Sequence, residues 1–70
     1  MVEVGDLVAY QPDRESMKAQ GVGLVVARKD KTTYDGLESI KTFIVEWIVA
    51  PFGFSDTNIC DAARLVKLND

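Results

Sequence analysis

The sequence is poor in the residues that cross-link many small domains. It contains one cysteine, Cys60, and no histidine. A disulfide within the chain is therefore excluded, and a zinc site of the usual cysteine–histidine kind has too few ligands. Nucleophilic catalysis lacks its commonest base, and we interpret Cys60 as a small buried apolar side chain. We expect a protein that is not an enzyme and that has no catalytic residues, no metal and no cofactor.

Side chains that could supply oxygen ligands to a metal ion are present, but their spacing does not match that of a known metal site. Asp56, Asn58 and Asp61 miss the glycine turn and distal glutamate of a calcium loop, so they are better explained as turn and cap formers. Glu46 is the one carboxylate inside an apolar strand. It is either a buried or interface carboxylate or, as we favour, a residue that faces solvent.

Long apolar runs are absent. The apolar stretches are far shorter than the roughly 20 residues that a membrane-spanning helix needs. The opening residues 1–6 do not combine a basic region with an apolar stretch, so we expect no signal peptide and no membrane partner. A single unpaired cysteine is typical of a reducing compartment, which predicts a cytoplasmic protein.

Basic residues are also scarce. The chain has 8 lysines and arginines and 11 acidic residues, which gives a net charge of −3. Nucleic-acid binding draws much of its affinity from basic side chains, so it is not the favoured function. One basic cluster remains as a candidate patch for nucleic acid or an acidic partner. It consists of Arg28, Lys29, Lys31 and, across an expected hairpin, Lys41. The alternative is a solvated hairpin end.

What the sequence does contain predicts one all-β domain over residues 1–70. Apolar residues make up 47% and charged residues 27%, which is typical of globular proteins. Runs of β-branched and aromatic residues bounded by glycine, proline and aspartate predict five strands. These strands are expected at residues 6–10, 21–28, 42–49, 55–60 and 65–68.

The connections carry their own signals. Residues 12–20 are expected to form a loop with room for one helical turn, and residues 61–64 a helical turn capped by Asp61. Residues 29–41 form a long polar connection that turns at Asp35-Gly36. Its apolar side chains Tyr34, Leu37 and Ile40 are expected to fold back against the body.

This order of elements resembles that of SH3-like barrels. The matching stretches are Val4-Gly5-Asp6-Leu7-Val8, Gly21 to Val26, Val45-Glu46-Trp47 and Ala63 to Leu68. The resemblance implies a small five-stranded SH3-like barrel with one short helical turn before the last strand. Gly21 and Gly23 would then mark a bulge or bend that helps the barrel to close, and Trp47 would fill its core.

Two narrower resemblances bear on function. The length and the Gly5-Asp6-Leu7-Val8 opening are similar to those of uncharacterised barrel proteins of tailed bacteriophages, including marine ones. The SH3-like peripheral subunit of photosystem I and the variable chain of ferredoxin–thioredoxin reductase also look similar, which implies an accessory role in electron transfer. The photosystem subunit is rich in basic residues after its opening glycine, whereas this chain has Ala9-Tyr10-Gln11. We therefore rank the bacteriophage resemblance first.

The strand at 42–49 gives the main functional clue. One face carries Phe43, Val45, Trp47 and Val49, and the other carries Ile44, Glu46 and Ile48. A half-buried strand alternates apolar and polar residues, so the second face is expected to be covered by the long loop or by another chain. The candidate interaction surface consists of Tyr10, Ile44, Ile48, Phe52 and Phe54.

These observations lead to a non-enzymatic protein-interaction or assembly module that binds a protein partner or itself, with a homo-oligomer expected. Phe52 and Phe54, at a Pro-Gly turn, are the expected exposed aromatic contacts, because exposed apolar patches mark contact sites. The first alternative is a nucleic-acid-binding barrel that uses the basic cluster. The second is an accessory subunit of an electron-transfer complex.

Overall fold

The structure is a computed structural model that describes residues 1–12 and 18–69. Its elements in chain order are β1 (Leu7–Tyr10), β2 (Gln20–Arg28), β3 (Lys31–Thr32), β4 (Ser39–Ile40), β5 (Thr42–Val49), β6 (Thr57–Asp61), the 3₁₀ helix η1 (Ala62–Arg64) and β7 (Leu65–Lys67). The predicted all-β class is confirmed. The helical turn allowed for in the 12–20 loop falls on residues 13–17, outside the described residues.

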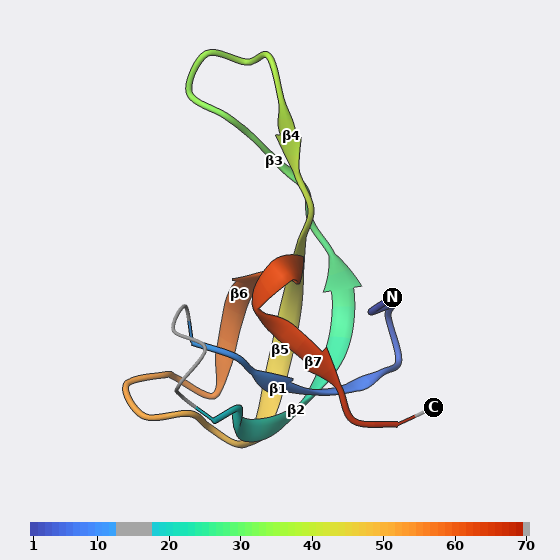
Figure 1. Cartoon of the computed structure of the whole chain (residues 1–70), viewed down its shortest axis with the longest axis vertical. Helices are drawn as coiled ribbons and strands as arrows, with labels where there is room; N and C mark the ends of the chain where they lie inside the picture. The colour runs from blue at the N-terminus through green and yellow to red at the C-terminus, as the bar shows by residue number, and fades with distance from the viewer. Residues whose placement is uncertain (13–17, 70) are drawn as a thin grey trace.

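Five strands form one antiparallel sheet in the order β6-β5-β2-β1-β7. The long strand β2 is its centre, because its first half pairs with β1 and most of its length pairs with β5. The sheet curls strongly, so that β1 and β7 pass in front of β2 and β5 (Figure 1). These are the five strands predicted from the sequence.

The core lies inside this curl and takes side chains from every strand of the sheet. Its buried members are Val8, Val25, Phe43, Val45, Trp47, Cys60 and Leu65. Trp47 is 8% exposed, which confirms it as a core residue, and Cys60 is buried as expected. Val49, assigned to the same face of its strand, is instead exposed at the strand end.

A glycine allows the two central strands to approach each other. Gly23 on β2 pairs with Trp47 on β5, and a Cβ at position 23 would lie 2.5 Å from Val45 Cγ1 and 2.6 Å from Trp47 Cε3. The β2–β5 register shifts beside it, between Val22 and Gly23. The expected irregularity near Gly21 and Gly23 is therefore confirmed, and such bulges increase local twist and bending.

The turn before the last strand is a 3₁₀ helix, but Asp61 does not cap it as predicted. Asp61 occupies the N-cap position without a hydrogen bond from its side chain to the helix. Its carboxylate lies 3.8 Å from Lys31 Nζ instead. The helix is held by its backbone, since Ala62 N donates to Lys41 O at 3.0 Å.

The long connection forms the expected hairpin, and the sequence prediction missed only its two short strands, β3 and β4. Strands β3 and β4 pair antiparallel, and residues 31–40, here called the arm, project far from the sheet (Figure 1). The expected turn at Asp35-Gly36 is present, with Gly36 at a φ of 73°. The expectation that Tyr34 and Leu37 fold back is wrong, since both are exposed at the arm's tip, while Ile40 is half-buried.

We predict that Gly23→Ala destabilises the fold by about 1–3 kcal/mol, because a methyl group there would overpack the β2–β5 contact. Urea unfolding followed by Trp47 fluorescence measures this. Gly36→Ala is the control for backbone strain without crowding: its Cβ meets nothing within 4 Å, and its positive φ alone costs about 1 kcal/mol. Equal effects of the two substitutions would contradict the close-packing account.

Candidate interaction surfaces

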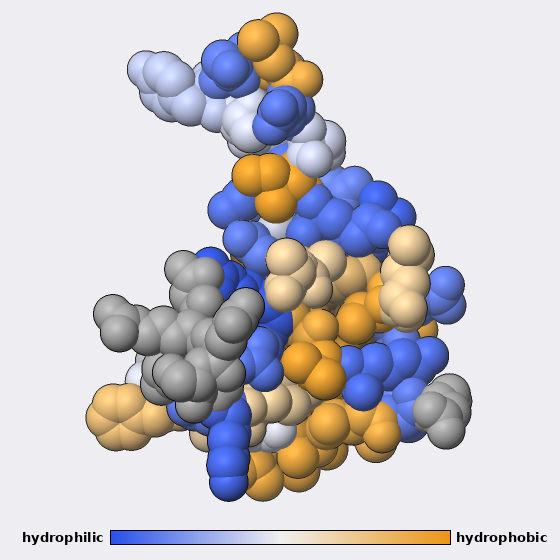
Figure 2. Space-filling view, in the orientation of Figure 1, coloured by the Kyte–Doolittle hydropathy of each residue, from blue (hydrophilic) through white to orange (hydrophobic). Residues whose placement is uncertain are grey.

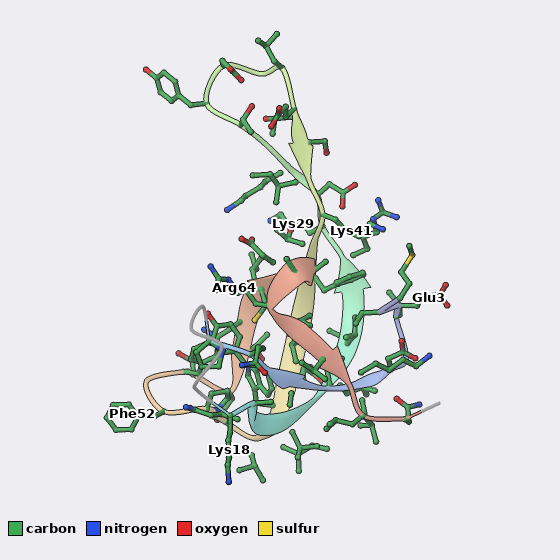
Figure 3. The ribbon with its side chains drawn as sticks, viewed as in Figure 1. Glu3, Lys18, Lys29, Lys41, Phe52 and Arg64 are labelled. Atoms are coloured by element: carbon green, nitrogen blue, oxygen red, sulfur yellow. The ribbon has the colours of Figure 1, made fainter. Side chains whose placement is uncertain are left out.

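The structure divides the predicted interaction surface into separate places. Tyr10 and Phe54 meet beside a cleft at the edge of the sheet. Ile44 and Ile48 lie on the side of β5 opposite to the core, and Phe52 stands alone on the turn between β5 and β6 (Figure 3). Five residues expected to act together thus belong to three different surroundings.

The cleft is built on a row of three aromatic rings. The ring centroids of Tyr10 and Phe54 are 4.6 Å apart in a tilted arrangement, and those of Phe54 and Trp47 are 5.8 Å apart, edge to face. Such geometries are the preferred ones for aromatic pairs. The turn that aims Phe54 inward is closed by its own N–H, which donates to Pro51 O at 3.0 Å. Phe54 therefore extends the core, and the expectation that it is an exposed contact is wrong.

Phe52 behaves in the opposite way. It lies two residues earlier on the same turn and is 96% exposed, and its ring points away from the molecule (Figure 3). The expectation of an exposed aromatic at this turn is confirmed for Phe52 alone.

The cleft itself has a volume of about 340 Å³ and lies between β6, the end of η1 and the Tyr10–Phe54 pair. Besides the aromatic pair, it is lined by Asn58, Ile59, Cys60, Asp61 and Arg64. Burial, and secondarily the neighbouring charge of Asp61, raises the pKa of the Cys60 thiol. Because only the thiolate is a strong nucleophile, this cysteine is a poor reactive group.

Two polar atoms near the aromatic row are buried without a hydrogen-bond partner within the described part of the chain. They are Trp47 Nε1 and Asn58 Oδ1, a donor and an acceptor. Thr42 Oγ1 at the other end of β5 has the same status. Buried polar groups normally find hydrogen-bond partners, so these three atoms are exceptions, and two of them lie near the aromatic row.

The outer face of the sheet, turned away from the core, carries several exposed apolar side chains. Register places Leu7 beside Leu24 and Ile44 beside Ile59 across neighbouring strands. Ile48 is 71% exposed on the same side of β5 as Ile44. We call Leu7, Leu24, Ile44, Ile48 and Ile59 the outer patch. Figure 2 shows apolar surface gathered at the lower end of the molecule, where β2 begins and β5 ends.

The outer patch is not covered by the long connection, which was one of two predicted covers. That connection forms the arm and leads away from the sheet. Glu46 interrupts the patch, pairs with Leu24 and Thr57 on its two neighbouring strands and is exposed. The favoured interpretation of Glu46 as a solvent-facing residue is confirmed.

The basic cluster forms at the base of the arm, where Lys29 and Lys41 lie close together (Figure 3). Carboxylates accompany two of its four members. Arg28 makes two 3.0 Å contacts with Asp30, which raise the pKa of the guanidinium and lower that of the Asp30 carboxyl. Lys31 lies 3.8 Å from Asp61. Tyr34 is exposed in the turn between β3 and β4, at the arm's tip and not at its base.

Among residues 1–12 and 18–69, no three His, Cys, Asp or Glu side chains gather closely enough to hold a metal ion. In the same part of the chain, no helix has the length and apolar character to cross a membrane.

Comparison of the chain with protein-family models, curated proteins and solved structures finds no match.

Sequence reasoning missed Leu7, Leu24 and Ile59 as members of the outer patch. Leu7 and Ile59 lie in short strands, and Leu24 follows Gly23 in the long strand β2. None of these segments by itself indicates an exposed apolar face. The signal appears only when strand register places Leu7 against Leu24 and Ile59 against Ile44. Such pairing joins residues far apart in the chain.

The two phenylalanines of one turn provide a matched test of the aromatic row. Phe54→Ala is expected to lower the free energy of unfolding by about 2–3 kcal/mol, somewhat less than for a fully buried phenylalanine. Phe52→Ala is expected to change it by less than about 0.5 kcal/mol, as for most exposed side chains. Urea titration of both variants checks this. Comparable losses would show that the two rings share one environment.

The Cys60 thiol is expected to react slowly with an aromatic disulfide reagent at pH 8 and rapidly once urea unfolds the chain. Burial excludes the reagent, and the raised pKa means that less thiolate is present at a given pH than in the unfolded chain. Absorbance of the released thiolate follows the reaction. A folded-state rate equal to that of the unfolded chain would contradict the burial of Cys60.

Proposed function

We propose that this chain is a non-enzymatic protein-interaction module with an SH3-like barrel fold, and that it associates with itself through the outer patch. The sheet order supports the fold, because reading from β7 gives β7-β1-β2-β5-β6 with η1 directly before the last strand. This is the plan that the sequence resemblance implies. The curl of the sheet around one shared core supports it as well.

The exposed outer patch is the observation that carries the proposal. Small monomeric proteins rarely expose contiguous apolar patches of this kind unless the patch makes contacts. Ile48 is 71% exposed in the strand whose inner face forms the core. Fully burying one isoleucine side chain contributes about 1.5–3 kcal/mol, so covering Ile48 and its neighbours would favour association.

A second copy is the simplest partner for this surface. A two-fold contact places one patch against an identical patch, which makes the patch complementary to itself. A domain of 70 residues has a thin core, and oligomerisation is one established way to stabilise such a domain. An assembly role of this kind agrees with the bacteriophage resemblance.

Ile48→Glu is expected to weaken self-association at least tenfold, since it replaces the most exposed apolar side chain of the outer patch with a carboxylate. Size-exclusion chromatography with light scattering, from micromolar to millimolar chain, measures the effect. Ser55→Glu adds the same charge at an exposed residue of the β5–β6 turn and serves as the matched control. A wild-type chain that stays monomeric throughout this range would overturn the proposal.

A further inference from the structure

The arm is a preorganised structure. Thr33 N donates to Glu38 O at 2.9 Å, and Gly36 N donates to Thr33 O at 2.9 Å. The Asp35 carboxylate accepts hydrogen bonds from Thr33 Oγ1 at 2.5 Å and from Leu37 N at 3.0 Å. These bonds hold residues 33–38, here called the tip, in one conformation before any partner arrives. Preorganisation of this kind reduces the entropic cost of binding.

The tip presents a distinctive combination of groups to solvent. Tyr34 is fully exposed and Leu37 is 82% exposed. Asp35 and Glu38 are the charged residues of the tip, and no lysine or arginine lies among residues 33–38. The hydrogen bonds to Asp35 lower the pKa of its carboxyl, which keeps the group ionised at neutral pH. The tip is therefore a rigid ligand with apolar side chains and two negative charges.

A groove of the opposite character lies on the body. It has a volume of about 420 Å³ and lies between the N-terminal segment, η1 and β7. Val2, Ala62 and Leu65 give it an apolar lining, and Lys41 and Lys67 are its basic residues. Figure 2 shows apolar surface on the face where η1 and β7 lie, bordered by hydrophilic side chains.

The two lysines have weak existing contacts. Lys67 Nζ lies 3.7 Å from Asp6 Oδ2, and Lys41 Nζ lies 3.9 Å from Met1 Sδ. The Asp6 carboxylate also accepts a hydrogen bond from Glu3 N at 2.8 Å, so it interacts with this N–H as well as with Lys67. An exposed pair as long as that of Lys67 contributes little. Lys67 can therefore accept a second carboxylate at small cost. Lys41 lies near enough to Asp30 to lower the pKa of that carboxyl, but among the described residues it makes no direct ion pair and can accept a first one.

We propose that the tip of one copy docks in the groove between η1, β7 and the N-terminal segment of a second copy. Leu37 and Tyr34 supply the apolar contact with the lining, and Asp35 and Glu38 lie toward Lys41 and Lys67. The negative charge of the tip is opposite to the positive charge of the groove. This complementarity identifies the tip as the occupant of the groove. This inference rests on the proposed self-association and gives it a second contact.

The tip cannot reach the groove of its own chain. Lys41, at the groove, follows directly on the arm's last strand, and the arm extends from there to the far end of the molecule's long axis (Figure 1). A second copy turned by 180° and lying alongside brings its own tip toward the groove. Two-fold symmetry then forms the contact twice and closes the assembly.

Sedimentation equilibrium on the full chain tests the contact. Leu37→Asp and the double variant Lys41→Glu with Lys67→Glu are each expected to raise the dissociation constant at least tenfold. Adding Glu38→Lys to the double lysine variant is expected to recover part of the affinity, because the charges are then exchanged between tip and groove. Ser55→Asp adds a carboxylate at an exposed residue outside both tip and groove. It is the matched control and should leave the constant unchanged.

Disulfide trapping locates the contact directly, even when association is weak. An equimolar mixture of Leu37→Cys chains and affinity-tagged Ala63→Cys chains is expected to give a tagged heterodimer under mild oxidation, since Ala63 lines the groove. Ser55→Cys replaces Ala63→Cys in the control mixture. Every sample also contains the buried Cys60. The wild-type chain is therefore oxidised in parallel, to show how much disulfide Cys60 alone forms.

The outcomes separate this inference from the function on which it rests. If Ile48→Glu abolishes association while the tip and groove variants do not, and trapping is unselective, the outer patch stands and the docking of the tip is wrong. If the tip and groove variants abolish association and Ile48→Glu does not, the docking stands and the outer patch is wrong. A monomeric wild type with no selective trapping overturns both.

Discussion

The close approach of β2 and β5 at Gly23 is the constraint on which the rest of the molecule depends. Because position 23 has no side chain, Val45 and Trp47 pack directly over the backbone of β2. That contact places the indole in the middle of the curl, where Phe54 and then Tyr10 continue the aromatic row. The bulge beside Gly23 bends the same strand, so β1 and β7 curl over to complete the core.

This arrangement uses only one side of the sheet. The core takes Phe43, Val45 and Trp47 from β5, whereas Ile44 and Ile48 face outward with neither a helix nor a second sheet layer among the described residues to cover them. The segment between β2 and β5 has the length to cover that face, but hydrogen bonds within the segment fold it into the projecting arm. The molecule therefore carries an uncovered apolar face, an acidic tip and a basic groove, which are the parts that the proposed self-association would use.

The central strands were predictable from the sequence because their signals are local. Thr42 to Val49 is a run of β-branched and aromatic residues, and such runs favour strands wherever they are packed. The turn at Asp35-Gly36 was predictable for the same reason, since glycine readily adopts the positive φ that the turn requires. The burial of Trp47 and Cys60 followed from their size and chemistry.

Other features depend on geometry that the sequence does not display. Phe52 and Phe54 are two residues apart and chemically identical, and the direction of one turn decides that only Phe54 enters the core. Asp61 looks like a helix cap, but η1 spans only Ala62–Arg64, and Lys31 on a neighbouring element attracts the carboxylate. Tyr34 and Leu37 look like anchors for a loop, yet the tip's internal hydrogen bonds hold them away from the body.

The most direct test of the uncovered outer face is a dilution series of the wild-type chain followed by methyl-resolved NMR. If the face is a contact surface between copies, the methyl signals of Leu7, Leu24, Ile44, Ile48 and Ile59 shift together between millimolar and micromolar chain, while Val8 and Val25 in the core stay fixed. Spectra that superimpose over the whole series, from a chain that diffuses as a monomer, would contradict the central claim, because the face would then be exposed at every concentration.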